Sequence, residues 1–190
     1  MADVISLCRE SPTSDALKAF STRQLRTAVD EMDNSNVLIA AARNPKPDCF
    51  LYLFSKKKLQ RTKFSQNYRG ENILHACVRN EAMTEENKLT ILRMTVCPKL
   101  VNQPDDIGMT PLMCSLMTCV SPLIDELLVE RGARCDIVDH SGRSPLQQVM
   151  LLERYDVLNI MLATKTCTDF QALEAASQLG NLKIFCFCKM

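Results

Sequence analysis

The sequence predicts an all-α protein, a solenoid in which about four to five helix–turn–helix units form a row closed by helical caps. Two observations predict this fold class. A pattern anchored on glycine recurs along the chain, and residues that commonly begin helices follow each copy. The composition, with 46% apolar and 24% charged residues among 190, is that of a chain that folds.

The recurring pattern is clearest at Gly70, Gly108 and Gly142, which are separated by 38 and 34 residues. A polar residue lies three places before each glycine, a helix-capping residue two places after it, and a leucine two places further on. In chain order these are Asn67, Asn72 and Leu74; Asp105, Thr110 and Leu112; Asp139, Ser144 and Leu146. Glycine permits the positive φ of a tight turn, and Pro111 or Pro145 then occupies the first helical position.

A second helix is expected in each unit. In the middle unit Ser121 is the predicted cap and Gly132 the predicted end of this helix. In the preceding unit we expect the second helix to begin near Thr84, which places the extra residues of the longer repeat in the loop 79–83.

The predicted organisation is a helical N-terminal cap followed by the repeat array. Ser14 and Ser21 are the candidate helix starts within the cap. The boundaries are 1–34 for the cap and 35–188 for the array, with clear repeats at about 65–163 and degenerate terminal units at 35–64 and 164–188.

In these segments the chain resembles ankyrin-repeat proteins. The resemblance rests on GMTPLMCS, LLVERGARCD, SGRSPLQQ and GENILHAC, and VNQPDDIGMTPL is similar to the loop called a finger in that family. It implies a stack of repeats that binds another protein and carries out no catalysis. Because the repeats fill nearly the whole sequence, we expect the chain to act by occupying, blocking or positioning its partner.

Small proteins made of such repeats resemble regulators of larger complexes. By this analogy we expect a regulatory subunit or inhibitor of a protein kinase complex in cell-cycle control. The alternatives are an inhibitor that sequesters a transcription factor and a generic adaptor or host-targeting ankyrin protein. Each of these three functional hypotheses predicts a protein partner, no small-molecule substrate and no cofactor.

His75 and Cys77 are the residues that most invite an enzymatic or metal-binding interpretation. Two residues on an α-helix are separated by about 200° of rotation, so these side chains point to opposite sides. We therefore expect His75 to bond the capping residue Asn72 or a backbone group, and Cys77 to pack as a small apolar residue. No catalytic residues and no metal ligands are predicted, and the pairs Cys114 with Cys119 and Cys186 with Cys188 also lack a four-ligand set.

The ten cysteines occur within apolar helical segments, and the N-terminus lacks the pattern of a secretory signal. We therefore expect reduced thiols and a cytoplasmic protein, with the nucleus as the alternative location. No apolar stretch reaches the roughly 20 residues that span a bilayer, and the net charge of +1 provides no overall attraction to nucleic acid or anionic membranes.

The finger positions that turn formation leaves free are the candidate partner-binding residues, together with Arg79 before the longer loop. These residues are Tyr68, Arg69, Glu71, Arg79, Asp106, Ile107, Met109, His140, Ser141 and Arg143. The alternative is that they are ordinary solvated turn residues. Tyrosine and arginine are frequent anchors of protein interfaces, which favours the binding interpretation.

Residues 56–69 contain six basic residues and no acidic one. The candidate basic patch consists of Lys56, Lys57, Lys58, Arg61 and Lys63. It is interpreted as a solvated repeat edge, a nuclear import signal or a docking patch for an acidic partner. Nucleic acid is disfavoured because regularly spaced aromatic residues and a reading helix are lacking.

Overall fold

The structure is a computed structural model that describes residues 3–118 and 121–180. Helices are the regular elements of these residues, together with one isolated β-bridge between Val29 and Asn36. In chain order they are α1 (Val4–Glu10), η1 (Asp15–Ala19), α2 (Thr22–Thr27), α3 (Val37–Ala42), α4 (Asp48–Ser55), α5 (Lys57–Gln60), η2 (Arg61–Phe64), α6 (Ile73–Val78), α7 (Glu85–Thr95), α8 (Pro98–Val101), α9 (Pro111–Thr118), α10 (Pro122–Glu130), α11 (Pro145–Leu151), α12 (Tyr155–Ala163) and α13 (Asp169–Gln178). The prediction of an all-helical protein is confirmed.

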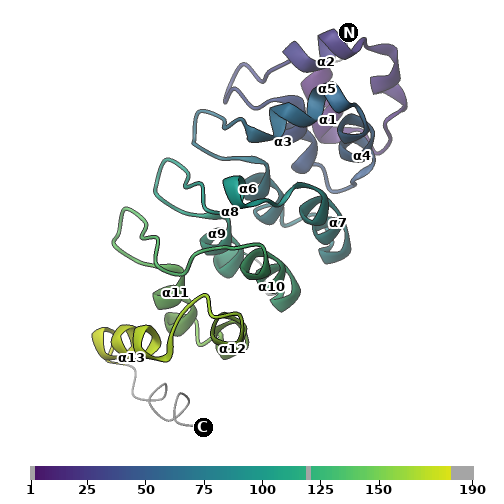
Figure 1. The fold of residues 1–190 in the computed structure, drawn as a ribbon. Coiled ribbons are helices and arrows are strands. Elements are labelled where there is room, and N and C mark those ends of the chain that lie inside the picture. Colours follow the sequence, from purple (N-terminus) through teal and green to yellow (C-terminus); the bar gives the residue numbers. More distant parts are fainter. Residues whose placement is uncertain (1–2, 119–120, 181–190) are drawn as a thin grey trace.

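The helices follow one another as a row of packed pairs (Figure 1). In one layer α3, α6, α9, α11 and α13 each contact the next, and in the other α7 contacts α10 and α10 contacts α12. Across the layers α6 packs on α7, α9 on α10 and α11 on α12. Each pair therefore buries its apolar surface against the pairs on either side.

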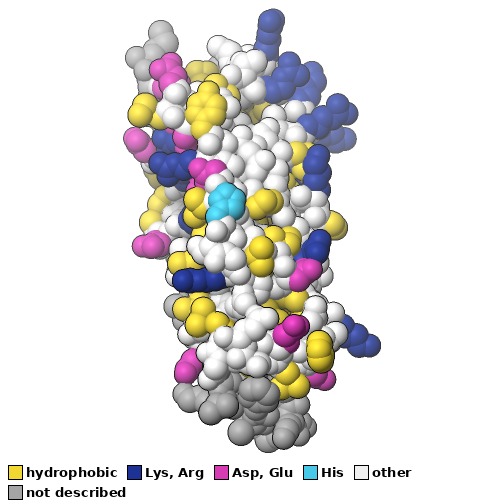
Figure 2. Space-filling model, turned by 90° about the vertical axis from the view of Figure 1, so that its left-hand side faces the viewer, with side chains coloured by type: hydrophobic (Ala, Val, Ile, Leu, Met, Phe, Trp, Pro, Cys, Tyr) yellow, Lys and Arg dark blue, Asp and Glu magenta, His cyan; other side chains and the backbone are white. Residues whose placement is uncertain are grey.

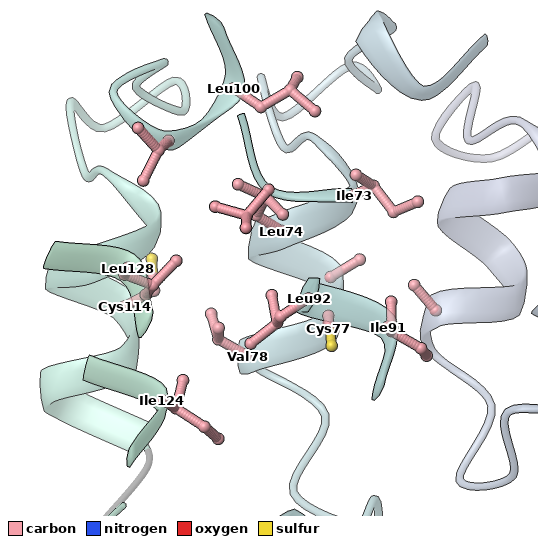
Figure 3. Close-up of a cluster of buried hydrophobic side chains, with 14 of the residues drawn as sticks. Ile73, Leu74, Cys77, Val78, Ile91, Leu92, Leu100, Cys114, Ile124 and Leu128 are labelled. Atoms are coloured by element: carbon pink, nitrogen blue, oxygen red, sulfur yellow. The ribbon is translucent and has the colours of Figure 1, made fainter. Parts of the chain in front are cut away.

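The core runs between the two layers and through successive pairs. Figure 3 shows part of it, where side chains from α6, α7, α9 and α10 point toward one another. All of the labelled residues are buried: Ile73, Leu74, Cys77, Val78, Ile91, Leu92, Leu100, Cys114, Ile124 and Leu128. The sulfur of Cys77 lies within this apolar cluster, where cysteine packs as a small hydrophobic residue.

Capping side chains fix most of the predicted helix starts. The Asn72 Oδ1 accepts the N–H of Leu74 at 2.9 Å, and the Thr84 Oγ1 accepts that of Asn87 at 3.4 Å. The loop 79–84 between α6 and α7 is three residues longer than the loop 152–154 between α11 and α12, so it takes three of the four extra residues that the repeat spacing assigns to this loop. Ser121 precedes α10 but makes no side-chain capping bond, so its predicted role is wrong.

The N-terminal segment covers the first pair. α1 packs on α3, and α2 packs on α5. Ser21 and Gln24 form a capping box at the start of α2, whereas Ser14 precedes η1 without a side-chain capping bond. Leu17 and Leu25 are buried and join these short helices to the core.

Among the described residues no helix combines the length and the apolar character needed to cross a membrane. The described cysteines carry free thiols, among them Cys8, Cys49 and Cys114. Cys119, Cys186 and Cys188 lie outside the described residues, as does the predicted terminal unit beyond residue 180.

Candidate functional site

Four similar loops precede α3, α6, α9 and α11, and we call residues 30–35, 67–71, 105–109 and 139–143 the finger loops. In each, the first residue donates its N–H to the carbonyl of the last: Asp30 to Ser35 at 2.9 Å, Asn67 to Glu71 at 3.0 Å, Asp105 to Met109 at 2.9 Å and Asp139 to Arg143 at 2.9 Å. The three predicted glycines have positive φ, and Asn34 takes this conformation in the first loop with φ 57°. The pattern therefore has a fourth copy that begins inside the segment predicted as the cap.

The polar residue that starts each finger loop organises the turn. The Asp105 Oδ1 accepts the backbone N–H groups of Ile107 at 3.1 Å and Met109 at 2.8 Å. Asn67 and Asp139 accept the two equivalent N–H groups in their own loops. An acceptor side chain at this position satisfies N–H groups that the tight turn leaves without backbone partners.

Neighbouring finger loops are joined by backbone hydrogen bonds. Tyr68 donates its N–H to the Asp33 carbonyl at 2.8 Å, Asp106 to that of Arg69 at 2.9 Å, and His140 to that of Ile107 at 3.1 Å. The loops consequently form one row along the left-hand side of Figure 1.

A groove of about 850 Å³ lies where the first two finger loops meet the ends of α3 and α6. Met32 and Tyr68, which are 88% and 72% exposed, are among its lining residues. Arg69, Glu71 and Arg79 also line it, so the structure brings four of the predicted partner-binding residues together. Figure 2 faces the finger loops and shows apolar side chains between charged ones over this part of the molecule.

An alternating series of seven charged residues runs past the groove, and five of them line it; we call this series the ion-pair ladder. Its members, in order, are Asp30, Arg9, Asp33, Arg43, Glu71, Arg79 and Asp105. Arg43 lies 2.6 Å from Asp33 and 2.7 Å from Glu71, and Arg79 pairs with Glu71 and lies 2.7 Å from Asp105. Each arginine thus bridges two acidic residues. Those of Arg9 lie in the first finger loop, and those of Arg43 and of Arg79 lie in successive finger loops.

The ladder holds the carboxylates of Asp33 and Glu71 in the charged form. Burial alone would raise the pKa of Asp33, but hydrogen bonds from Arg43 and Ser35 lower it to about 2. Burial opposes the charged form of Glu71 as well, and bonds from Asn67 and Arg79 with the charge of Arg43 lower its pKa. A buried carboxylate with several such donors stays ionised.

The ladder ends at Asp105 because the next two units lack its arginines. Arg43 and Arg79 each lie seven residues after the capping residue of their unit, and Met117 and Leu151 occupy the equivalent positions. Both of these side chains are largely exposed. The surface beside α9 and α11 is consequently less charged than the groove.

Three of the predicted partner-binding residues are tied into the protein. Glu71 is only 5% exposed and contacts two arginines of the ladder, so the expectation that it is free for a partner is wrong. Arg79 is half-buried between Glu71 and Asp105. Met109 packs partly against the core.

The remaining predicted residues are exposed at the tips of the finger loops. Tyr68 and Arg69 lie at the second loop, and Ile107, with 51% exposure, lies at the third. The others are Asp106, His140, Ser141 and Arg143. These side chains extend the candidate surface beyond the groove along the row of loops.

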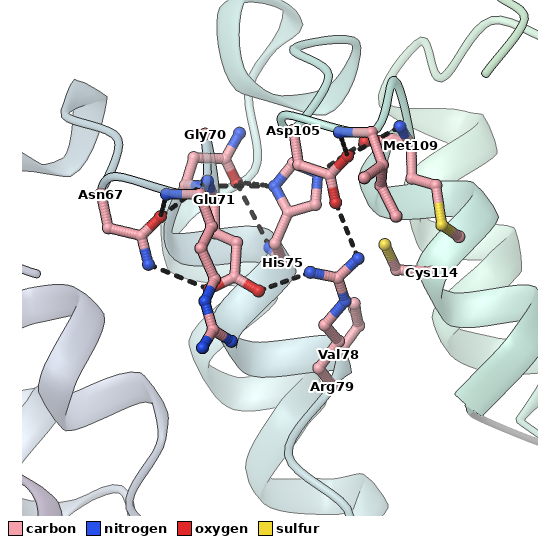
Figure 4. A network of polar contacts seen from close by, with 12 residues as sticks. Asn67, Gly70, Glu71, His75, Val78, Arg79, Asp105, Met109 and Cys114 are labelled. Carbon is pink, nitrogen blue, oxygen red and sulfur yellow. Dashed lines mark hydrogen bonds and ion pairs between the residues drawn. The ribbon is translucent and has the colours of Figure 1, made fainter. Parts of the chain in front are cut away.

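His75 connects α6 to the third finger loop (Figure 4). Its Nε2 lies 2.9 Å from the Met109 carbonyl, which can only accept, so Nε2 carries the proton. Its Nδ1 then accepts the N–H of Asn72 at 3.2 Å, which is the predicted bond at the helix start. Burial lowers the pKa of His75 and favours this neutral form.

Asp105 and Cys114, rather than Cys77, are the reactive residue types closest to His75. Ligand atoms of these three buried side chains lie within 4.8 Å of one another. Both His75 nitrogens and both Asp105 oxygens already bond protein groups, and the Arg79 cation contacts Asp105. Burial raises the pKa of the Cys114 thiol to about 12, which keeps it protonated. This set does not fit a metal ion or an activated cysteine.

The candidate basic patch lies at the N-terminal end of the row, on α5 and η2. Lys57, Lys58 and Arg61 are exposed. Lys56 and Lys63 are partly covered and place their Nζ atoms 4.6 Å from the Tyr52 ring and 5.1 Å from the Phe64 ring. Arg23 and Arg26 of α2 lie beside this patch.

Sequence reasoning missed the groove residues Arg9, Met32, Asp33 and Arg43. Arg43 and Arg79 share one repeat position, and an alignment that included the first finger loop would have revealed it. Arg9 carries no such signal because its partners lie more than 20 residues away.

Comparison with known proteins adds no assignment to this geometry. No protein-family model matches the chain, and no curated protein matches it.

Proposed function

We propose that this chain is a non-catalytic protein-binding module built as an ankyrin-repeat array with helical caps. The repeated finger loops, each followed by a short helix that packs on a second helix, support this proposal. So do the residues at the repeated positions, above all the glycine, the capping residue and the proline before a helix. Both ring nitrogens of His75 already bond groups of the protein, which supports the proposal that the module is non-catalytic.

The single observation that carries the binding function is the groove with its exposed tips. Tyr68 is 72% exposed although aromatic side chains are usually covered. The backbone beneath it is fixed by one hydrogen bond to the Asp33 carbonyl and by the turn of its own loop. A large, exposed and rigidly held aromatic residue beside arginines is typical of an interface anchor.

The partner we propose is a protein kinase complex, with this chain as a regulatory subunit or inhibitor in cell-cycle control. This rests on analogy with other small proteins of the same repeat type. A transcription factor held away from DNA and a generic adaptor role are the competing outcomes that the experiment distinguishes.

Site-specific photo-crosslinking tests the proposal directly. We would place a photoreactive phenylalanine analogue at Tyr68 and, in a control protein, at Leu123, which is exposed on α10 away from the groove. Each protein is incubated and irradiated in native extract, and the adducts are identified by mass spectrometry. We expect a kinase complex to crosslink to position 68 and not to position 123.

Direct binding to the purified partner completes this test. Tyr68→Ala should weaken binding at least tenfold, and Leu123→Ala should leave it within twofold. A DNA-binding protein captured in the same way, and displaced from DNA by the chain, would replace the kinase assignment. Equal crosslinking from both positions would refute the groove as the binding site.

A further inference from the structure

A small pocket lies between α2 and α5, at a distance from the groove. Arg23 and Arg26 of α2 and Lys58 of α5 line it together with Thr22. Arg23 and Arg26 are three residues apart and therefore share one face of the helix. The pocket is about 220 Å³, smaller than the roughly 300–1,000 Å³ of sites for drug-sized ligands. It has room for a single functional group.

The positive charge of this pocket is not neutralised by the described part of the chain. Arg23, Arg26 and Lys58 form no ion pair with any described residue, in contrast to the arginines of the ladder. The segments 16–29 and 49–70, which supply α2, α5 and η2, contain no aspartate or glutamate. In Figure 2, lysine and arginine side chains follow the right-hand edge of the upper half, while acidic side chains there lie toward the left and centre.

The basic surface continues from the pocket toward α8. Lys63 of η2 and Lys99 of α8 place their Nζ atoms 5.1 Å and 4.6 Å from the Phe64 ring. Phe64 is a partly exposed aromatic residue of this surface. Because two ammonium groups lie against its ring, the ring is not free to stack on a nucleobase or to insert into a lipid layer.

We propose that this pocket binds a phosphate group on a peptide segment of a protein partner, with acidic residues of that segment along η2 and α8. Two guanidinium groups and an ammonium suit the oxygens of a phosphate. A phosphate monoester carries about −1.5 to −2 charge at pH 7, which matches three unpaired cations better than a single carboxylate does. The site is separate from the groove and goes beyond the proposed function.

Fluorescence anisotropy with a labelled peptide tests the proposal. The probe is a glutamate-rich peptide with one phosphoserine, compared with the same peptide carrying serine, and the protein is the full chain at physiological salt. We expect the phosphorylated peptide to bind about tenfold more tightly. The double variant Arg23→Gln/Arg26→Gln should abolish this difference and leave the thermal melting curve unchanged, because both side chains are exposed.

The matched control is Arg93→Gln/Arg131→Gln, which removes the same charge from exposed positions on α7 and after α10. This control variant should preserve the preference for the phosphorylated peptide. Tyr68→Ala should preserve it as well, so the experiment distinguishes a wrong assignment of this pocket from a wrong assignment of the groove. Equal binding of the two peptides would overturn the proposal, and so would equal losses in both double variants. Tighter binding of single-stranded RNA or phosphatidylserine vesicles that depends on Arg23 and Arg26 would also overturn it.

Discussion

His75 joins two units that are far apart in the sequence. Its ring is fully buried, accepts a bond from Asn72 at the start of its own helix and donates one to Met109, 34 residues later. Only the neutral imidazole offers one acceptor and one donor nitrogen in this arrangement. The residue therefore acts as a polar connector between α6 and the third finger loop.

Replacement of His75 by alanine should destabilise the protein by about 2–4 kcal/mol. The change leaves the Asn72 N–H and the Met109 carbonyl without partners and opens a cavity in a buried region. Thermal and urea unfolding followed by circular dichroism would measure the loss. The chain offers its other histidine as a control, since His140 is exposed and His140→Ala should change stability by less than about 0.5 kcal/mol. Equal effects of the two substitutions would contradict the connector role.

The finger loops depend on glycine for two separate reasons. Gly108 has φ +82° and Gly142 has φ +77°, a conformation that strains other residues. A Cβ at Gly108 would in addition lie 2.8 Å from the His140 backbone nitrogen of the next loop. A Cβ at Gly142 would meet no atom within 4 Å.

This difference predicts unequal effects of alanine at the two glycines. Gly142→Ala should cost about 1–2 kcal/mol, the strain of the left-handed conformation alone. Gly108→Ala should cost clearly more, because the third and fourth loops must also separate. Urea unfolding of both variants provides the comparison, and an equal loss of unfolding free energy would show that contact between the loops contributes little.

The elements were predictable wherever a local chemical signal marked them. Glycine, a capping residue and proline located the later finger loops and helices, and Thr84 located α7. The first finger loop escaped detection because it has one extra residue and uses Asn34 in place of glycine. α1 was missed because seven residues carry little periodicity, and its burial is decided by packing on α3.

The groove was predictable only in part, because burial and pairing depend on the neighbouring unit. Tyr68 and Arg69 follow from their position in the loop. Glu71 looked equally free in the sequence, but Arg43 of the preceding unit and Arg79 of its own enclose it. The sequence of a single repeat does not reveal a contact between residues that are 28 positions apart.

At the scale of the whole molecule, the buried carboxylates of the ladder and Asp125 of α10 respond differently to protons. The ladder carboxylates Asp33 and Glu71 have lowered pKa values. Their contribution to stability is present above their ordinary pKa values near 4 and is lost as the pH falls through the lowered pKa values, of which that of Asp33 is about 2. Asp125 of α10 has the opposite sign, because burial raises its pKa to about 6 despite bonds from Ser115 and Arg154. Its protonation between pH 7 and pH 4 favours the folded state.

Acid should therefore open the N-terminal half first. We expect hydrogen exchange at pH 2.5, corrected for the intrinsic rate and compared with pH 7, to reveal lost protection in α3 and α6. Protection in α10 and α12 should persist. The variant Asp33→Asn removes one titrating group of the ladder and should reduce the change in α3. Simultaneous loss of protection in both halves would contradict a dominant role for the ladder.

The backbone bonds between finger loops have a consequence for the thermodynamics of association. Because Tyr68, Asp106 and His140 are each anchored to the preceding loop, the main chain at the tips is already ordered before any partner arrives. Little conformational entropy remains to be lost on this side of an interface, so the cost of ordering falls on the partner. Affinity at this surface should then vary mainly with the stiffness of the bound segment, and cyclised or helical ligands should dissociate more slowly than flexible ones of equal sequence.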